Sequence, residues 1–202
     1  LGAVDVLVHN AGDMIHELER SKDGIERITA THVVGPYVLT RRLIDSGKLT
    51  TVNGARVIFV ASGGMYTQPL KVQALHTFPK KYDGVVHYAL TKRAQVVLAN
   101  LMDDHYGEAG AIRFAAMHPG WVDTPALSRA MPLFKRVTQP ILRTPEQGAD
   151  TVAWLAICPI DCWSSETRFY FDRRPAPVHL TDRTRRDSDA PKQLHAYLSR
   201  FL

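Results

Sequence analysis

The sequence is poor in cysteine and in long apolar runs. Cys158 and Cys162 are its only cysteines among 202 residues, and no further cysteine or histidine stands near them to complete a structural zinc site. Reduced thiols are typical of cytoplasmic proteins. No apolar run reaches the 18 or so residues that a membrane-spanning helix needs. We therefore expect a cytoplasmic protein with no membrane span and no bound metal.

A concentrated basic surface is also missing. The 25 lysines and arginines outnumber the 20 acidic residues and give a formal net charge of +5, but they occur as scattered pairs such as Arg41-Arg42 and Lys80-Lys81. Nucleic-acid binding favours one continuous basic face, so we expect no nucleic-acid partner. The charge supports only a mild attraction for anionic nucleotides.

A glycine-rich phosphate-binding turn is the most consequential absence. None of the 13 glycines forms a Gly-x-Gly-x-x-Gly or Gly-x-x-x-Gly-x-Gly pattern, which is the usual cradle for a pyrophosphate. The chain also starts at Leu1 rather than at a methionine. We expect either that the natural protein has upstream residues or that this is a truncated gene product. A gap filled by another chain is the third alternative.

The sequence does contain an alternation of short apolar runs and helical patterns. The apolar runs predict buried strands at residues 4–9, within 55–64, at 112–117 and at 168–171. Helices are predicted at roughly 23–46, 85–106 and 145–157. This alternation is typical of a parallel sheet with helices on its faces. We therefore predict an α/β fold at 1–182, followed by a polar linker and a short helix at 183–202.

Tyr88 and Lys92 are the most informative pair. On a helix, residues i and i+4 lie on one face with their Cβ atoms about 5–6 Å apart. A nearby ammonium group favours the ionised form of a phenol, so the pair could pass a proton to or from a carbonyl or alcohol oxygen. Ser62 is predicted at the carboxyl end of a strand, where open α/β sheets bind ligands. Taken alone, the pair would be better explained as a tyrosine of an amphipathic helix beside a snorkelling lysine.

The order of four motifs along the chain resembles the short-chain dehydrogenase/reductase family. The motifs are Asn10-Ala11-Gly12, the strand-end Ser62, Tyr88-x-x-x-Lys92 and Pro119-Gly120-x-Val122-x-Thr124. The resemblance covers nearly the whole chain. It implies a Rossmann-like, doubly wound parallel sheet of which this chain holds only the C-terminal part, about four strands with flanking helices. The first three strands of the family's domain would be missing, which would leave residues 4–9 as an uncovered sheet edge.

The resemblance also implies roles for individual residues. Tyr88 would be the catalytic acid/base, Lys92 would tune its pKa and bind the nicotinamide ribose, and Ser62 would hold the substrate oxygen. The implied cofactor is NAD or NADP. The residues that the resemblance assigns to cofactor binding are Asn10, Ala11, Gly12, Tyr88, Lys92, Pro119, Gly120, Val122 and Thr124.

One catalytic position departs from the family pattern. His32 stands where the family often has an asparagine that holds a water in the proton relay to the lysine. An imidazole could act as a relay in its place, although it is bulkier and titratable, and a structural role is the alternative. Pro36 disturbs the same helical stretch because it removes one backbone N–H.

Two further segments are expected near the site. Residues 66–83 read as an inserted loop. Residues 125–143, with their Leu, Met and Phe side chains, either form a substrate lid with an apolar surface or a helix packed on the core. We therefore expect an NAD(P)-dependent oxidoreductase acting on a small apolar carbonyl or alcohol in its full-length form. The alternative is an inactive fragment or partner-binding scaffold, and a homodimer through helices 23–46 and 85–106 follows by analogy.

Overall fold

The predicted α/β fold is confirmed. The computed structural model describes residues 2–49, 54–107, 112–185 and 188–202. A five-stranded sheet with the order β1-β2-β3-β4-β5 forms its centre, and the first four strands are parallel. The strands are β1 (Val6–His9), β2 (Ala55–Val60), β3 (Ile112–Met117), β4 (Phe169–Phe171) and β5 (Arg174–Pro175).

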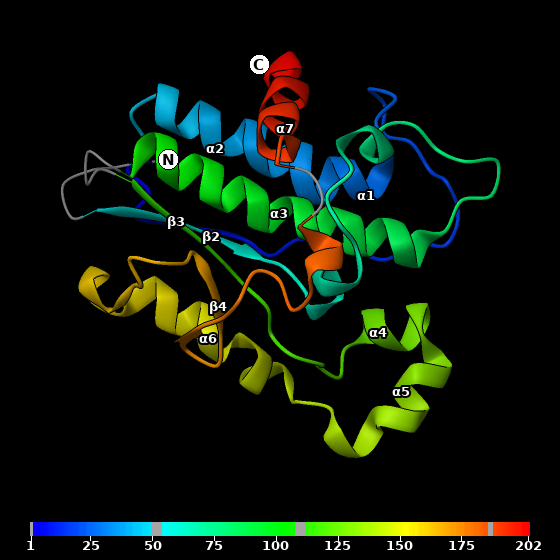
Figure 1. Cartoon of the computed structure of the whole chain (residues 1–202). Coiled ribbons are helices and arrows are strands. Elements are labelled where there is room, and N and C mark those ends of the chain that lie inside the picture. The colour runs from blue at the N-terminus through cyan, green and yellow to red at the C-terminus, as the bar shows by residue number, and fades with distance from the viewer. Residues whose placement is uncertain (1, 50–53, 108–111, 186–187) are drawn as a thin grey trace.

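Helices cover both faces of this sheet. They are α1 (Arg27–Thr29), α2 (Gly35–Asp45), α3 (Gly84–Tyr106), α4 (Pro125–Ala130), α5 (Pro132–Thr138), α6 (Pro145–Ile157) and α7 (Ala190–Leu198). Figure 1 shows α2 and α3 on one face and α6 on the other, with α4 and α5 beyond the end of β3. None of the described helices has the length and apolar character needed to cross a membrane.

The helix boundaries follow from capping side chains. Asp83 accepts hydrogen bonds from the backbone N–H groups of Val85 and Val86 and so begins α3. Thr144 and Gln147 form a reciprocal capping box at the start of α6. The first helical stretch begins at Arg27 rather than near residue 23, because Gly24 takes a positive φ of 76° in a turn and Glu26 caps the helix that follows.

A π-helical turn interrupts the first helical stretch. It spans Ala30–Val34 between α1 and α2, and it contains His32. Pro36 follows within the first turn of α2. Since proline has no N–H, the carbonyl of His32 cannot receive the α-helical hydrogen bond that residue 36 would normally donate. The disturbance predicted from Pro36 therefore takes the form of a local widening of the helix, a feature often found at functional sites.

The two ends of the sheet differ in how they finish. In the described part of the chain, β1 pairs only with β2, and Val8 is 39% exposed, as the predicted sheet edge requires. At the other end, β5 pairs antiparallel with β4 and was not expected. The turn between them places Asp172 and Arg173 at positive φ without a glycine, so the usual sequence signal for a tight hairpin is missing.

The C-terminal helix packs against the rest of the molecule. Leu194 and Leu198 of α7 are fully buried, and α7 contacts α3 (Figure 1). Residues 186 and 187 of the predicted linker lie outside the described residues. The division at residue 182 remains a prediction.

Asp103 ties α3 to the sheet. Its buried carboxylate accepts from the backbone N–H of Phe114 at 2.8 Å, from Arg113 Nε at 3.0 Å and from Arg168 Nε. Hydrogen bonds of this kind to a buried charge are strong, and removing the acceptor leaves the donors without partners. This carboxylate therefore fixes the far end of the helix that carries Tyr88 and Lys92.

We expect Asp103→Ala to lower the free energy of unfolding by about 3–5 kcal/mol, because it strips two partly buried guanidinium groups and a buried N–H of their acceptor. Chemical denaturation monitored by circular dichroism measures the change. Asp104→Ala removes an exposed carboxylate one residue along the same helix and should change the stability by less than about 0.5 kcal/mol. Equal effects of the two variants would contradict this role of Asp103.

Candidate active site

The structure brings Ser62, Tyr88 and Lys92 together at the carboxyl end of β2. Ser62 follows β2 in an extended conformation, accepts from the Gly64 N–H at 3.2 Å, and shares a hydrogen bond with the Tyr88 hydroxyl. Tyr88 and Lys92 lie on one face of α3, with Lys92 Nζ 5.6 Å from the centroid of the Tyr88 ring. The spacing of the sequence therefore produces the predicted juxtaposition.

Lys92 is buried among neutral hydrogen-bond acceptors. Its side chain is inside the protein, with the residue only 4% exposed. Nζ donates to the backbone carbonyl of Val60 at 2.8 Å and to Oε1 of Gln95 at 3.1 Å. Burial lowers the pKa of Lys92 to about 7, since the charged form loses hydration and gains no carboxylate partner among these acceptors. The amine is therefore poised to change protonation state near neutral pH.

The Tyr88 phenol is not acidified in the way that the pair spacing suggested. Burial raises the pKa of Tyr88, and its hydrogen bond with Ser62 acts in the opposite direction. A lysine whose own pKa is about 7 is only partly charged at neutral pH, so it is a weak source of positive potential. In this arrangement the Tyr88 phenol is in its protonated form at neutral pH, and it can therefore act as a proton donor.

His32 joins two parts of the site through both ring nitrogens. Nε2 accepts from the Asp13 N–H at 3.2 Å, which places the ring proton on Nδ1, and Nδ1 donates to Thr91 Oγ1 at 2.9 Å. Thr91 in turn donates to the Tyr88 carbonyl at 2.8 Å. Burial, with the nearby charge of Lys92, holds the pKa of His32 well below its usual value. The imidazole is thus neutral and fully used as a clamp between the turn after β1 and α3.

The Asn10-Ala11-Gly12 turn lies at the edge of this site. Asn10 and Ala11 are exposed at the end of β1. A Cβ atom at Gly12 would stand 2.8 Å from His32 Nε2 and 3.5 Å from Lys92 Nζ. A side chain at this position would therefore collide with the clamp, which gives the glycine a steric reason. The cofactor contacts implied for the turn remain a prediction.

The predicted segment after β3 follows the same sheet edge. His118 Nδ1 accepts from the Gly120 N–H at 3.3 Å, and Gly120 has a positive φ of 78°. Thr124 caps α4 by accepting from the Leu127 N–H, and Val122 packs against the space beside Gly148. Pro119 is partly buried. The structure thus gives Val122 and Thr124 local packing and capping contacts, and their predicted cofactor contacts remain untested.

Gln95 is a residue at this site that the motifs did not reveal. Its side chain is fully buried, Nε2 donates to the His32 carbonyl at 2.9 Å, and Oε1 accepts from Lys92. Gln95 stands three residues after Lys92, a spacing that places both on one helix face. That spacing is the only signal in the sequence that could have identified it.

These features agree with a family comparison. A family model described as "short chain dehydrogenase" matches residues 1–132. The chain belongs to the short-chain dehydrogenase/reductase family. Dehydrogenase/reductase SDR family member 12 of Bos taurus is 43% identical over 178 residues, which are 88% of this chain and 54% of the bovine protein. The chain therefore spans about half the length of the curated relatives it matches.

Solved structures of short-chain dehydrogenases share the fold. The 3-ketoacyl-(acyl-carrier-protein) reductase from Brucella melitensis, complexed with NADH, superposes with a TM-score of 0.56 at 22% identity. The match covers 83% of this chain and 64% of the reductase chain. The angucycline C-6 ketoreductase LanV, with bound NADP, gives a TM-score of 0.60 at 24% identity over 85% of this chain and 61% of its own. At these identities the comparisons establish the fold alone.

The predicted insertion at residues 66–83 is more ordered than a loop. Residues 63–67 and 72–75 form short 3-10 turns, and Met65, Leu70 and Leu75 are buried. The buried guanidinium of Arg93, next to Lys92, donates to the carbonyls of Met65 and Gln68 at 3.2 Å each. The segment is therefore packed beside the candidate site and anchored to α3.

Both ends of the predicted lid are joined to each other. Arg143 N donates to the Trp121 carbonyl at 2.7 Å, and Asp123 N donates to the Arg143 carbonyl at 2.9 Å. The Arg143 side chain pairs with Asp172 in the β4–β5 turn. Between these ends lie α4 and α5, where Leu133 and Val137 are each 73% exposed. The side chain of Phe134 lies outside the described residues.

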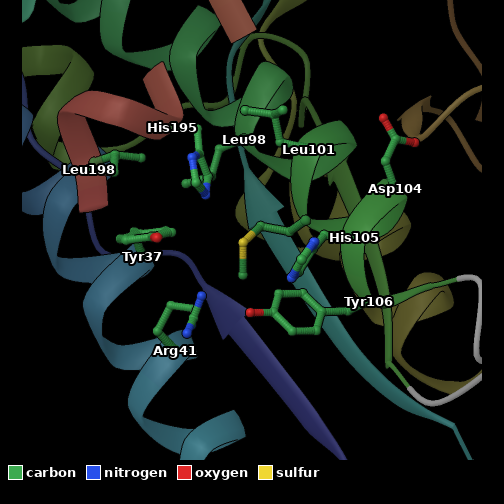
Figure 2. Close-up of a pocket in the computed structure, with 10 residues that line it drawn as sticks. Tyr37, Arg41, Leu98, Leu101, Asp104, His105, Tyr106, His195 and Leu198 are labelled. Atoms are coloured by element: carbon green, nitrogen blue, oxygen red, sulfur yellow. The ribbon is translucent and has the colours of Figure 1, made fainter. Parts of the chain in front are cut away.

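A separate cavity of about 260 Å³ lies between α2, α3 and α7. Figure 2 shows Tyr37, Arg41, Tyr106 and His195 around it. It shares no lining residue with the Ser62–Tyr88–Lys92 site. Because α7 packs here against α3, the chain's own C-terminal helix covers part of the α3 surface that was predicted to form a homodimer. The homodimer itself remains a prediction.

Glu26 supports the N-terminal end of α3. Its buried carboxylate contacts His87 Nε2 at 2.7 Å and accepts from the Ile28 and Thr29 N–H groups. Burial alone would raise the pKa of Glu26, but hydrogen bonds from His87 and from these two N–H groups lower it from 4.5 to about 2. The folded state therefore binds the ionised form more tightly than the unfolded state does.

We expect this carboxylate to make the free energy of unfolding pH-dependent. Because the folded pKa is depressed, its contribution is complete above about pH 4.5 and is lost as the pH falls towards 2, by about 3 kcal/mol in all. Urea denaturation at several pH values measures this. Glu26→Gln should flatten the profile in that window, whereas Glu17→Gln, at an exposed site, should not. Parallel profiles for parent and Glu26→Gln would contradict the assignment.

Proposed function

We propose that the full-length protein is an NAD(P)-dependent oxidoreductase that interconverts a small apolar ketone or aldehyde and the corresponding alcohol. The observation that carries the proposal is the meeting of the Tyr88 hydroxyl, the Ser62 hydroxyl and the Lys92 amine at one strand end. Family membership supports the reaction class, and substrate and cofactor are part of the proposal.

The proton chemistry follows from the site's own residues. In reduction, the protonated Tyr88 hydroxyl donates a hydrogen bond and then its proton to the carbonyl oxygen, which Ser62 holds by a second hydrogen bond. The phenolate left behind is stabilised by a proton on Lys92, whose pKa near 7 allows it to carry one at neutral pH. In oxidation the same groups act in reverse.

The residues present fit the nicotinamide end of a dinucleotide. Lys92 has three donor hydrogens and uses two on protein acceptors, which leaves one for a ribose hydroxyl. Gly12 has no side chain beside this amine, where a Cβ would stand 3.5 Å from Lys92 Nζ. NAD(P)H would supply the hydride. Tyr88, Lys92, the 10–12 turn and residues 119–124 are proposed to hold it, and the two neighbours with bound NADH and NADP are consistent with either form.

The apolar substrate class rests on the 125–143 segment. Leu133, Val137 and Ile141 are 73%, 73% and 64% exposed. Leu133 and Val137 are four residues apart in α5 and so lie on one side of that helix, and Ile141 follows in a 3-10 turn. Exposed apolar residues in a segment that leaves the site edge suit a surface that closes over an apolar ligand. We propose that this segment contacts the substrate.

We expect Tyr88→Phe in the full-length protein to reduce kcat for NAD(P)H-dependent reduction of apolar ketones by at least about 10²-fold, because the proton donor is lost. Cofactor affinity, measured by fluorescence titration, should change by less than about threefold. Tyr106→Phe, at the far end of the same helix, is the matched control and should retain activity. Full activity in Tyr88→Phe would contradict the proposed role. Failure of the parent protein to bind NADH or NADPH would favour the inactive-scaffold alternative.

A further inference from the structure

The Lys92 amine is connected by two successive hydrogen bonds, through Gln95 of its own helix α3, to the π-helical turn before α2. Lys92 Nζ donates to Gln95 Oε1 at 3.1 Å, and Gln95 Nε2 donates to the His32 carbonyl at 2.9 Å. All three residues are buried, with Gln95 and His32 fully so. A side-chain amide buried with both of its ends engaged has a single orientation, because its N–H must face the carbonyl and its oxygen must face the amine.

Pro36 creates the acceptor for this amide. In a regular helix the N–H of residue 36 would donate to the carbonyl of residue 32, but proline has none. The π-helical turn at Ala30–Val34 displaces the backbone at the same point. The His32 carbonyl therefore lacks the donor that a regular α-helix would provide, and its burial makes a donor from another element favourable. Gln95 supplies it.

We propose that Gln95 is a positioning residue, which fixes the Lys92 amine by bridging it to the His32 backbone carbonyl, whose α-helical donor Pro36 removes. The bridge joins the catalytic helix α3 to the turn before α2, while the second Lys92 hydrogen bond joins it to the end of β2 at Val60. The amine is thus held from two sides by neutral groups. Its relevance to turnover rests on the proposed function, whereas its effect on Lys92 does not.

The bridge predicts how Lys92 responds when Gln95 is changed. An amide oxygen accepts more strongly from an ammonium group than from a neutral amine. Gln95→Met has a similar volume but no acceptor, so the charged form of Lys92 should lose support. Gln95→Glu places a carboxylate at the same point and should stabilise the charged form. The two variants should therefore move the Lys92 titration in opposite directions.

The test is a direct titration of Lys92 in the full-length protein. Side-chain NMR of protein labelled with ¹³C and ¹⁵N at lysine follows the Nζ signal, which Lys92→Arg identifies by its loss. We expect a midpoint near pH 7 in the parent, lower by about one pH unit in Gln95→Met and higher by at least about one in Gln95→Glu. Gln73→Leu, at an exposed glutamine, should leave the midpoint unchanged. Midpoints that agree between the parent and both Gln95 variants would overturn the proposal.

Pro36→Ala provides a second route if a Gln95 variant does not fold. It restores an N–H at residue 36, which competes with Gln95 for the His32 carbonyl and releases the amide. We expect the Lys92 midpoint to move in the same direction as in Gln95→Met, and a Pro36→Ala midpoint equal to that of the parent would count against the bridge.

Kinetics separate this proposal from the proposed function. If both hold, the pH at which kcat for reduction falls as Lys92 loses its proton moves with the NMR midpoint in each variant of the full-length enzyme. A moved NMR midpoint in a protein without NAD(P)H-dependent activity supports the Gln95 bridge and contradicts the enzyme proposal. An unmoved midpoint in a protein with NAD(P)H-dependent activity supports the enzyme proposal and contradicts the Gln95 bridge.

Discussion

The burial of one amine among neutral groups governs the arrangement of this site. Lys92 cannot be held by a strong ion pair through the acceptors it has, Val60 O and Gln95 Oε1, so its place is fixed by hydrogen-bond geometry. Those acceptors belong to a strand end and to its own helix, and the second is itself anchored on the π-helical turn. The end of β2, helix α3 and the π-helical turn before α2 must therefore all be correctly positioned for the amine to lie beside Tyr88.

His32 and Gln95 together connect the turn after β1, the π-helical turn and α3. The His32 ring links the turn after β1 to Thr91, while its backbone carbonyl receives Gln95. The ring can do this only while neutral, because Nε2 must accept a hydrogen bond, and deep burial favours that state. This departure from the family pattern thus has a local structural explanation: the imidazole is a connector whose two nitrogens are both committed.

The sequence predicted most of the fold because its signals are local. The apolar runs within 55–64 and at 112–117 and the helical patterns at 85–106 and 145–157 lead directly to the observed elements. It also predicted that Ser62, Tyr88 and Lys92 meet, since a strand end and an i,i+4 helix pair leave little freedom. The β4–β5 hairpin escaped because its turn contains no glycine. Gln95 escaped because its partner carbonyl is distant in sequence, and the pKa of Tyr88 because burial, which no spacing reveals, outweighs charge.

The closed base of the 125–143 segment has a consequence for how this protein can change over evolutionary time. The strand end that precedes the segment and the helix that follows it are bonded directly to each other through Trp121, Asp123 and Arg143. A change in the length of the segment between these points therefore does not displace the sheet. The segment between them can be lengthened, shortened or replaced while Ser62, Tyr88 and Lys92 keep their places. If the segment contacts the substrate, as proposed, substrate preference can diversify without a change in these three residues.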